Sequence, residues 1–314
     1  MENYDFIIIG AGGVGLAAAM YAGRLGLKTL VLGASHGSEL PIGGVITTTN
    51  IVENYPGFIN LTGEEIAKKI EDHAKSYKEV TVKSEKVEDV KKIKDNFYVK
   101  TKKAEYNAKA LLFATGTKWR KLEVEGSKEY ENKGINYCAI CDAPLFRNKI
   151  VAVVGGSDSA AKDALLTTEF AKKVYMIYRG ESIHPEPINL KRVKSNKKIE
   201  IINNTNIKEI KGNEFVTHVI LDKPYKGSKE LKLDAIFVAI GHIVLSDLAK
   251  KLGVKLNEKD EIIIDHATSK TNTPGIFAAG DVTDKPFKQL ITGVADGCTA
   301  AYSAYEYITN NKVM

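Results

Sequence analysis

The sequence predicts an α/β fold of two domains, with the second domain inserted in the first, and three observations lead to this prediction. An apolar strand runs into a glycine-rich turn and a helix near residue 10, the same pattern recurs near residue 155, and each copy later ends in an apolar strand closed by Ala-x-Gly. A chain of 314 residues has room for two domains, because single hydrophobic cores stop growing at about 250–300 residues. We therefore expect two Rossmann-like domains of the three-layer ββα type.

The first copy has the complete glycine pattern of a dinucleotide-binding turn. The apolar run Phe6–Ile9 leads directly into Gly10-Ala11-Gly12-Gly13-Val14-Gly15, and helical residues follow to position 25. Gly10 permits the tight turn, Gly12 lets the backbone approach a pyrophosphate, and Gly15 lets the helix pack closely on the strand. Because it follows a strand and opens a helix, the pattern predicts a dinucleotide site.

The next strand, Lys28–Leu32, begins at the distance from Gly10 that a βαβ unit requires, about 20 residues. Such a strand usually ends in an acidic residue that binds the ribose, but Gly33 stands at that place. We therefore expect other groups to hold the ribose.

The second copy is less complete. Its strand Ile150–Val154 leads into Gly155-Gly156-Ser157-Asp158-Ser159-Ala160, which places serine where backbone and pyrophosphate approach most closely. The strand Lys173–Ile177 is followed by a single arginine, Arg179, whereas a cluster of guanidinium groups holds a 2′-phosphate best. The pattern supports NADPH or NADH only weakly, and a Rossmann scaffold that has lost its nucleotide site stays open as an alternative.

The two copies end in similar strands, Leu111–Gly116 and Ile236–Gly241. A later strand, followed by Gly280-Asp281-Val282, is expected to return to the first domain. These limits divide the chain into a discontinuous first domain and an inserted second domain, residues 1–115 with 244–314 and residues 116–243.

Between the two exits stand Cys138 and Cys141, three residues apart and followed by Asp142. Three cysteines in the chain cannot form a structural disulfide framework, and the C-x-x-C spacing lowers a thiol pKa. Zinc would need four nitrogen or sulfur ligands, and the chain has no second C-x-x-C and no H-x₃₋₅-H pattern. These residues favour redox chemistry over a metal site or an inert pair of thiols. Cys298 is expected to open an alanine-rich helix as a small core residue.

Composition argues against other classes of function. Lys and Arg number 45 against 39 Asp and Glu, but the lysines are scattered, which is typical of solvated faces and not of a nucleic-acid-binding patch. No apolar run approaches the ~20 residues that span a bilayer, and no secretory signal precedes the first strand. We expect a cytoplasmic protein that binds neither nucleic acid nor membrane.

Several further motifs, in a specific order and spacing, identify a known family. They are Gly10–Gly15, Gly43-Gly44, Thr47–Thr49, Val52–Gly57, Ala114–Gly116, Cys138–Asp142, Gly280–Val282 and Asp296–Cys298. In these the chain resembles, over nearly its whole length, the low-molecular-weight (class II) thioredoxin reductases of the pyridine nucleotide–disulfide oxidoreductase group. The resemblance implies FAD in the first domain, a nicotinamide site in the second, a homodimer, and a thioredoxin- or glutaredoxin-like protein as partner.

Carried over by position, the resemblance implies that Cys141 faces the flavin, that Cys138 attacks the disulfide of the partner, and that Asp142 protonates a leaving thiolate. It implies FAD-binding positions at Gly10, Gly12, Gly13, Gly15, Gly33, Gly43, Gly44, Val45, Asn54, Val87, Ala114, Thr115, Gly116, Gly280, Asp281, Lys288, Gln289 and Leu290. It implies nicotinamide-binding positions at Gly155, Gly156, Ser157, Asp158, Ser159, Arg179 and Gly241.

The chain also departs from the family pattern. Val45 replaces a glutamine, Lys288 replaces an arginine, and Arg179 alone remains of a double-arginine nucleotide signature.

From the motifs and the resemblance together, we expect an enzyme that passes electrons from NAD(P)H through FAD and the Cys138–Cys141 pair to a thioredoxin-like protein. The alternatives are the same enzyme with NADH, ferredoxin or a deazaflavin as donor, a dithiol oxidase that uses oxygen, and a non-catalytic flavin-binding redox sensor.

Overall fold

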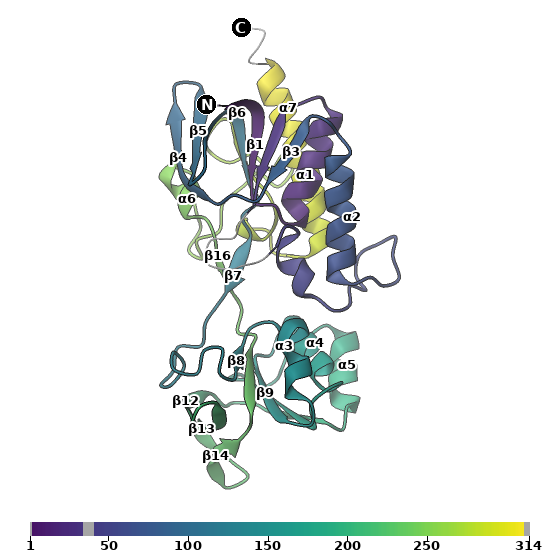
Figure 1. Ribbon diagram of the computed structural model, residues 1–314, viewed down its shortest axis with the longest axis vertical. Helices are drawn as coiled ribbons and strands as arrows, with labels where there is room; N and C mark the ends of the chain where they lie inside the picture. Colours follow the sequence, from purple (N-terminus) through teal and green to yellow (C-terminus); the bar gives the residue numbers. More distant parts are fainter. Residues whose placement is uncertain (1, 34–40, 311–314) are drawn as a thin grey trace. The chain divides into compact units, whose positions relative to one another are not determined.

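The computed structural model describes residues 2–33 and 41–310 (Figure 1). The chain divides into two compact units, the first made of Met1–Lys118 and Val244–Met314, the second of Trp119–Ile243. At the two junctions, β7 (Thr117–Trp119) and β16 (His242–Val244) pair with each other. The predicted α/β fold, with one Rossmann-like domain inserted in another, is confirmed.

The first unit is built on a parallel sheet in the order β3-β2-β1-β6, with β17 also paired to β6. The bounds of these strands are Glu2–Ile9 (β1), Thr29–Leu32 (β2), Val80–Lys83 (β3), Glu105–Phe113 (β6) and Ile276–Ala278 (β17). Phe6–Ile9 are all at most 4% exposed, so both faces of β1 are covered. This burial explains why the strand is apolar without a break.

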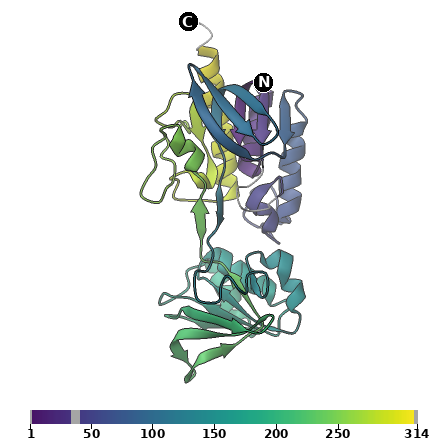
Figure 2. The ribbon, with the colours of Figure 1, turned by 60° about the vertical axis from the view of Figure 1, so that its left-hand side comes forward.

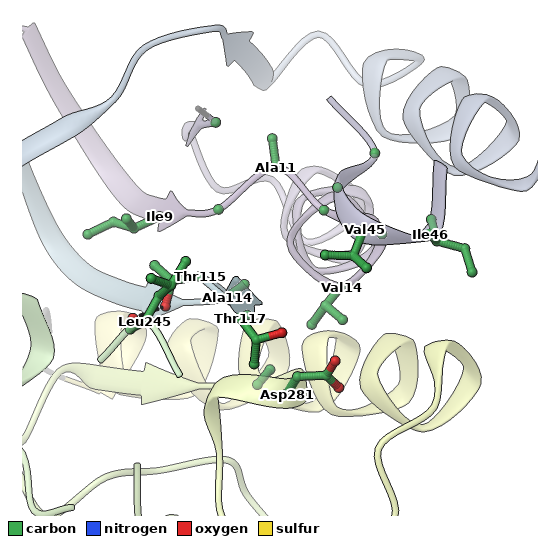
Figure 3. Close-up of a pocket in the computed structure, with 18 of the residues that line it drawn as sticks. Ile9, Ala11, Val14, Val45, Ile46, Ala114, Thr115, Thr117, Leu245 and Asp281 are labelled. Atoms are coloured by element: carbon green, nitrogen blue, oxygen red, sulfur yellow. Dashed lines mark hydrogen bonds between the residues drawn. The ribbon is translucent and has the colours of Figure 1, made fainter. Parts of the chain in front are cut away.

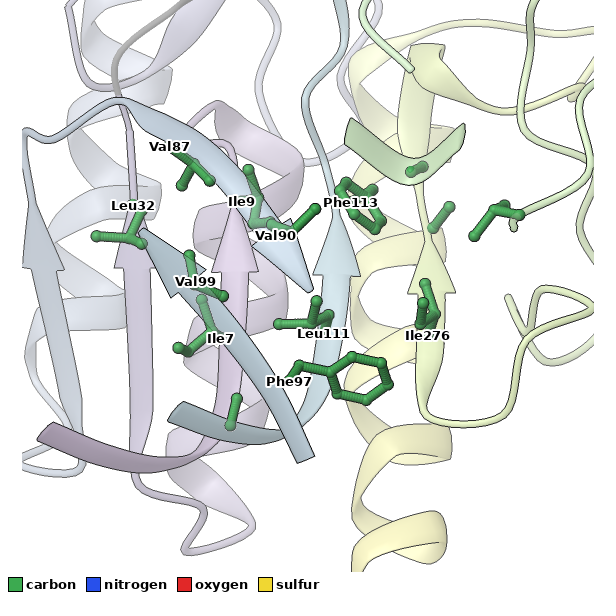
Figure 4. Packing of buried hydrophobic residues seen from close by; sticks show 14 of the residues in the cluster. Ile7, Ile9, Leu32, Val87, Val90, Phe97, Val99, Leu111, Phe113 and Ile276 are labelled. Carbon is green, nitrogen blue, oxygen red and sulfur yellow. The ribbon is translucent and has the colours of Figure 1, made fainter. Parts of the chain in front are cut away.

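Helices cover one face of this sheet, namely α1 (Gly13–Arg24), α2 (Gly63–Lys75) and α7 (Leu290–Asn310) (Figure 1). Phe6 and Ile8 pack into this layer against alanines of α1 and α7, such as Ala18 and Ala301. Residues of β4 (Val87–Ile93) and β5 (Asn96–Thr101) lie over the other face, where Val90, Phe97 and Val99 pack against Ile7 and Leu111 (Figure 4). α6 (Asp247–Lys251) packs against β4.

Helix α7 corrects one expectation. Cys298 does not open this helix, because α7 begins at Leu290, and the half-buried Cys298 lies in its interior. Small residues let α7 lie close to α1: a Cβ on Gly297 would be 2.5 Å from the backbone oxygen of Val14. Among the described residues, no helix is both long and apolar enough to cross a membrane.

The second unit repeats the design with a parallel sheet in the order β11-β10-β9-β15-β8. The strands span Ile135–Asn136 (β8), Ile150–Val154 (β9), Lys173–Ile177 (β10), Ile199–Ile202 (β11) and Ala235–Val238 (β15). Its helices are α3 (Ala139–Asp142), α4 (Asp158–Thr167) and α5 (Pro187–Ser195). An antiparallel sheet of β12 (Ile207–Gly212), β13 (Val216–Tyr225) and β14 (Ser228–Lys232) completes the unit (Figure 2).

The core of the second unit alternates in the same way as that of the first. Val151 and Val153 pack with alanines of α4, whereas Ala152 and Val154 pack with side chains of the antiparallel sheet, including Val219. Each parallel sheet therefore separates a helical layer from a second β layer, as the ββα prediction requires.

Candidate functional site

A pocket of about 290 Å³ opens in the first unit where β1, β2 and β6 end (Figure 3). The carboxyl ends of parallel strands are where open α/β sheets bind ligands. Figure 3 shows Thr117 and Asp281 on one side of this space and Ala11 on the other. Most of the predicted FAD positions line it: Gly10, Gly12, Gly13, Gly33, Gly43, Gly44, Val45, Val87, Ala114, Thr115, Gly116, Asp281, Lys288, Gln289 and Leu290.

The glycines of the turn have different roles. Gly10 has φ +118° and a Cβ there would lie 2.1 Å from the backbone oxygen of Ala114, so the turn has no room for a side chain. A Cβ on Gly12 would meet nothing nearer than the backbone oxygen of Gly43 at 3.7 Å. Space is therefore left beside Gly12, on the wall of the pocket.

The first turn of α1 adds an anion-binding element to this wall. Gly12 is the N-cap residue of α1. In this fully described helix, no side chain caps the N-terminus and the first turn holds no acidic residue. The leading N–H groups of a helix lack partners within the helix and carry partial positive charge. This end of α1 can therefore bind a phosphate group.

Three predicted FAD positions do not line the pocket but support its walls. A Cβ on Gly15 would lie 1.9 Å from the backbone oxygen of Gly10, and one on Gly280 would lie 2.9 Å from a methyl carbon of Val14. The Asn54 side-chain amide donates a 2.9 Å hydrogen bond to Oε1 of Gln289. The structure thus brings these residues next to pocket residues without placing them in the pocket itself.

Sequence reasoning missed other residues of the pocket, including Thr49, Lys86, Leu245 and Asp247. Lys86 directly precedes Val87, which was predicted, and could have been found from that neighbour. Leu245 and Asp247 come from the segment after the inserted unit, and only the folded topology brings them to Gly116. The backbone N–H of Leu245 donates to the oxygen of Gly116 at 3.0 Å.

The cysteine pair lies in the second unit, after β8. Cys138 is the N-cap residue of α3 and forms a disulfide with Cys141. The backbone N–H of Cys141 donates to Sγ of Cys138 at 3.3 Å, a contact that favours charge on that sulfur when the pair is reduced. Burial raises the pKa of the neighbouring Asp142 carboxyl. A raised pKa suits a group that has to give a proton to a thiolate.

The predicted nicotinamide positions surround the start of α4. Gly155 has φ +148° and Gly241 has φ +98°, and Gly156 is covered by the ring of Tyr178. The Ser157 hydroxyl accepts a long 3.5 Å hydrogen bond from the backbone N–H of Ala160, so this helix is capped by its own side chain, unlike α1.

Two further predicted positions open α4, and one follows β10. Asp158 and Ser159 are its first residues, and Asp158 accepts hydrogen bonds from the backbone N–H of Glu186 and the side chain of Asn189. Burial alone would raise the Asp158 pKa, but the hydrogen bonds from Asn189 and Lys162 outweigh it and keep the pKa low. A carboxylate therefore stands at the first residue of α4. Arg179 lies two residues beyond the end of β10.

A glycine-walled dinucleotide pocket in one unit and a disulfide on a short helical turn in the other define a nucleotide-dependent disulfide oxidoreductase. A family model for the pyridine nucleotide-disulphide oxidoreductases matches residues 4–301. The chain belongs to this family.

Individual relatives agree over the whole chain. The protein is 36% identical over 310 residues to the thioredoxin reductase of Bacillus subtilis, with 97% of this chain and 95% of that one covered. It is 34% identical to the solved thioredoxin reductase of Lactococcus lactis in its FR conformation, with a TM-score of 0.91 and coverage of 98% and 99%. The T. acidophilum thioredoxin reductase has the same identity and TM-score, with 100% of both chains covered. The predicted likeness to low-molecular-weight thioredoxin reductases is confirmed.

A more distant relative has also been solved. It is a ferredoxin-flavin thioredoxin reductase of Clostridium acetobutylicum, which is 28% identical to this protein and has a TM-score of 0.53. The match covers 99% of each of the two chains.

Proposed function

We propose that this protein is an FAD-dependent reductase of a thioredoxin-like protein, in which electrons pass from a reduced nicotinamide through FAD to the Cys138–Cys141 disulfide. The observation that carries the proposal is the occurrence, in one chain of the disulfide oxidoreductase family, of an anion-binding dinucleotide pocket and a disulfide next to an acid of raised pKa. We assign residues 1–115 and 244–314 to FAD binding and residues 116–243 to the domain that carries the dithiol.

The residues of the pocket fit FAD. Gly12 and the first turn of α1 would hold the pyrophosphate, and Gly33 leaves the ribose to groups such as Lys86, which lines the same pocket. Asp281 would bind the ribityl chain, while Gln289 and Leu290, at the start of α7, would lie against the ring. FAD, when bound there, accepts a hydride and passes an electron pair to a disulfide.

At the reduced dithiol, the proposed exchange with the partner proceeds in two displacements. The Cys138 thiolate attacks one sulfur of the partner's disulfide, a mixed disulfide forms, and the other partner sulfur leaves as a thiolate. Asp142 gives that thiolate its proton. The Cys141 thiolate then attacks Sγ of Cys138, which re-forms the Cys138–Cys141 disulfide and releases the second partner sulfur as a thiolate, which takes a proton from solvent.

The cysteines provide the direct test. Cys138→Ser and Cys141→Ser should each reduce NAD(P)H-dependent thioredoxin reduction to the uncatalysed background while FAD stays bound, because neither can close the disulfide. Cys298→Ser is the matched control, since Cys298 is half-buried in α7 and should leave turnover unchanged. Undiminished turnover in both single variants would overturn the proposal and leave only a binding function, such as a redox sensor.

The donor is a second question, and two observations favour testing ferredoxin beside NADPH and NADH. Ser157 caps α4, and a related solved protein is a ferredoxin-flavin thioredoxin reductase. Anaerobic titration of the yellow protein with each donor identifies the one that reduces the flavin. Bleaching of the flavin by NADPH or NADH would establish a nicotinamide as the electron donor, and bleaching by reduced ferredoxin alone would establish ferredoxin as the donor. Oxidation of a small dithiol to its disulfide with reduction of oxygen to hydrogen peroxide, without thioredoxin reduction, would indicate an oxidase.

We further propose a cytoplasmic homodimer that binds neither nucleic acid nor membrane. The family resemblance supports the dimer. Ile51, Phe58 and Ile59, which lie between residues 51 and 59 of the first unit, are each exposed, Ile59 to 93%. Several large apolar side chains exposed in one short segment are a candidate for a protein contact. Sedimentation of the wild type and of Ile59→Glu, in the same buffer, tests whether a dimer forms and whether this segment takes part.

A further inference from the structure

Lys288 links the FAD pocket to a carboxylate that lies outside it. The side chain lines the pocket two residues before α7 begins. Its ammonium group donates to the backbone oxygen of Asp281 at 3.0 Å and forms an ion pair with Glu261. Both side chains are largely buried, with 27% of Lys288 and 15% of Glu261 exposed.

Glu261 is itself held from the other side by Asn257. The Asn257 side-chain amide donates to Oε2 of Glu261 at 2.7 Å, and the Asn257 side-chain oxygen accepts from the backbone N–H of Glu261 at 3.0 Å. Burial alone would raise the Glu261 pKa, but the hydrogen bonds from Lys288 and Asn257 outweigh it, so the pKa stays below its ordinary value. Glu261 is therefore a fixed negative charge at neutral pH.

We infer that Glu261 is a positioning residue that holds the Lys288 ammonium at the pocket wall and, together with Lys288, sets the reduction potential of bound flavin. The inference rests on the proposed function, because it requires FAD in this pocket. Reduced flavin carries negative charge, which a nearby cation stabilises and a nearby carboxylate destabilises, more strongly in a site that excludes water. The pair contributes one charge of each sign, so removing either one leaves the other uncompensated. Lys86, Asp247 and Asp281 also line the pocket and stay unchanged in this comparison.

The two single variants are expected to shift the potential in opposite directions. Glu261→Gln keeps the size of the side chain and leaves an uncompensated cation, so the reduced flavin should be stabilised and its reduction potential should rise. Lys288→Met leaves an uncompensated carboxylate, so the reduced flavin should be destabilised relative to the oxidised flavin and the reduction potential should fall. We expect the ratio of reduced to oxidised flavin at a fixed potential to change about tenfold in each case, which is ~30 mV for a two-electron couple. The double variant should return to within about threefold of the wild type.

The measurement is the equilibrium of protein-bound FAD with dyes of known potential, made on the full chain with FAD bound. Lys288→Arg keeps the charge and should keep the wild-type potential. Asp5→Asn is the matched control, because Asp5 pairs with Lys109 at 2.6 Å in the same unit but lies in β1 four residues before the pocket residue Ile9.

The outcomes separate the inference from the function on which it rests. Potentials that stay constant, or move in the same direction in Glu261→Gln and Lys288→Met, while both variants retain FAD, would overturn the inference. A wild-type chain that retains no FAD would instead overturn the proposed function. Should Glu261→Gln fail to fold, the comparison of Lys288→Met with Lys288→Arg decides, because equal potentials in these two variants contradict the inference.

Discussion

Two glycines of the same turn, Gly10 and Gly12, should respond to alanine in different ways. In Gly10→Ala, the new Cβ would lie 2.1 Å from the backbone oxygen of Ala114 at a φ of +118°. Strained φ costs about 1–3 kcal/mol and overpacking a further 1–3 kcal/mol, so we expect the first unit to lose about 2–6 kcal/mol of stability. That is a large part of the 5–15 kcal/mol typical of a folded domain.

In Gly12→Ala, the same methyl group finds room in the flavin-free protein. The backbone φ of −75° suits alanine, and the nearest atom to the new Cβ is the Gly43 oxygen at 3.7 Å. We expect the stability of the flavin-free protein to stay within about 1 kcal/mol, because the lower entropy of the unfolded chain offsets a poorer N-cap. The methyl group does occupy the place where a pyrophosphate would approach, which should weaken FAD binding by about 1–3 kcal/mol, or about 5- to 150-fold.

Urea unfolding of the flavin-free proteins and a fluorescence titration with FAD measure both quantities. Gly12→Ala that binds FAD as tightly as the wild type, or Gly10→Ala that unfolds at the same urea concentration as the wild type, would contradict the roles assigned to the two glycines. A loss of stability in Gly12→Ala as large as that in Gly10→Ala would also show that the distinction between the two glycines is wrong.

Three further changes test other parts of the structure. Burial raises the pKa of Asp163 to about 7, against about 4 in the unfolded chain. This group therefore contributes stability that is fully present below about pH 4 and is lost as the pH rises to 7. Asp163→Asn should remove this pH dependence and stabilise the second unit at pH 8 by about 2–4 kcal/mol, measured by urea unfolding across the pH range. Lys285→Met leaves the buried Asp296 carboxylate without its 2.7 Å ion pair and should lower the free energy of unfolding by about 3 kcal/mol. An unchanged melting temperature would show that the ion pair contributes little to stability. Asp142→Asn should slow thioredoxin reduction by about 10²-fold or more. It should also abolish the fall in rate that we expect of the wild type at pH values above the raised Asp142 pKa; a parallel pH profile in the variant would exclude Asp142 as the proton donor.

The parts of the fold that were predictable depend on local signals. The apolar run Phe6–Ile9 and the turn at Gly10 specify a strand and its exit within a few residues, and the copy at Ile150–Gly155 does the same. Steric contact explains why the signal is so local. A side chain at Gly10 or Gly155 would strike the backbone of the neighbouring strand exit, so glycine is required there whatever the rest of the chain does.

Some features carried a local signal that was not used. β13 and β14 are joined by the two residues Lys226-Gly227, both with positive φ, which is the tight turn that favours glycine at its second place. That turn, between alternating apolar residues such as Val219 and Leu221, is typical of a hairpin. The antiparallel sheet of the second unit could therefore have been predicted from the sequence.

Other features of the site had no local signal. Leu245 reaches the pocket from beyond the inserted unit, and Glu261 pairs with Lys288 at a sequence separation of 27 residues. Such contacts depend on the path of the backbone through the whole first unit. Neither the type nor the spacing of these residues specifies that path.

The inserted unit begins and ends at neighbouring points of the backbone. The Arg120 N–H donates to the Gly241 oxygen at 2.9 Å, and the Leu245 N–H donates to the Gly116 oxygen at 3.0 Å, so the outgoing and returning chains run side by side. A short linker can therefore replace the whole insertion without stretching the remaining chain. At the same two junctions, the homologous unit of another reductase can be inserted, and such chimaeras would show whether electron-donor preference is exchanged together with this unit while the flavin half is kept.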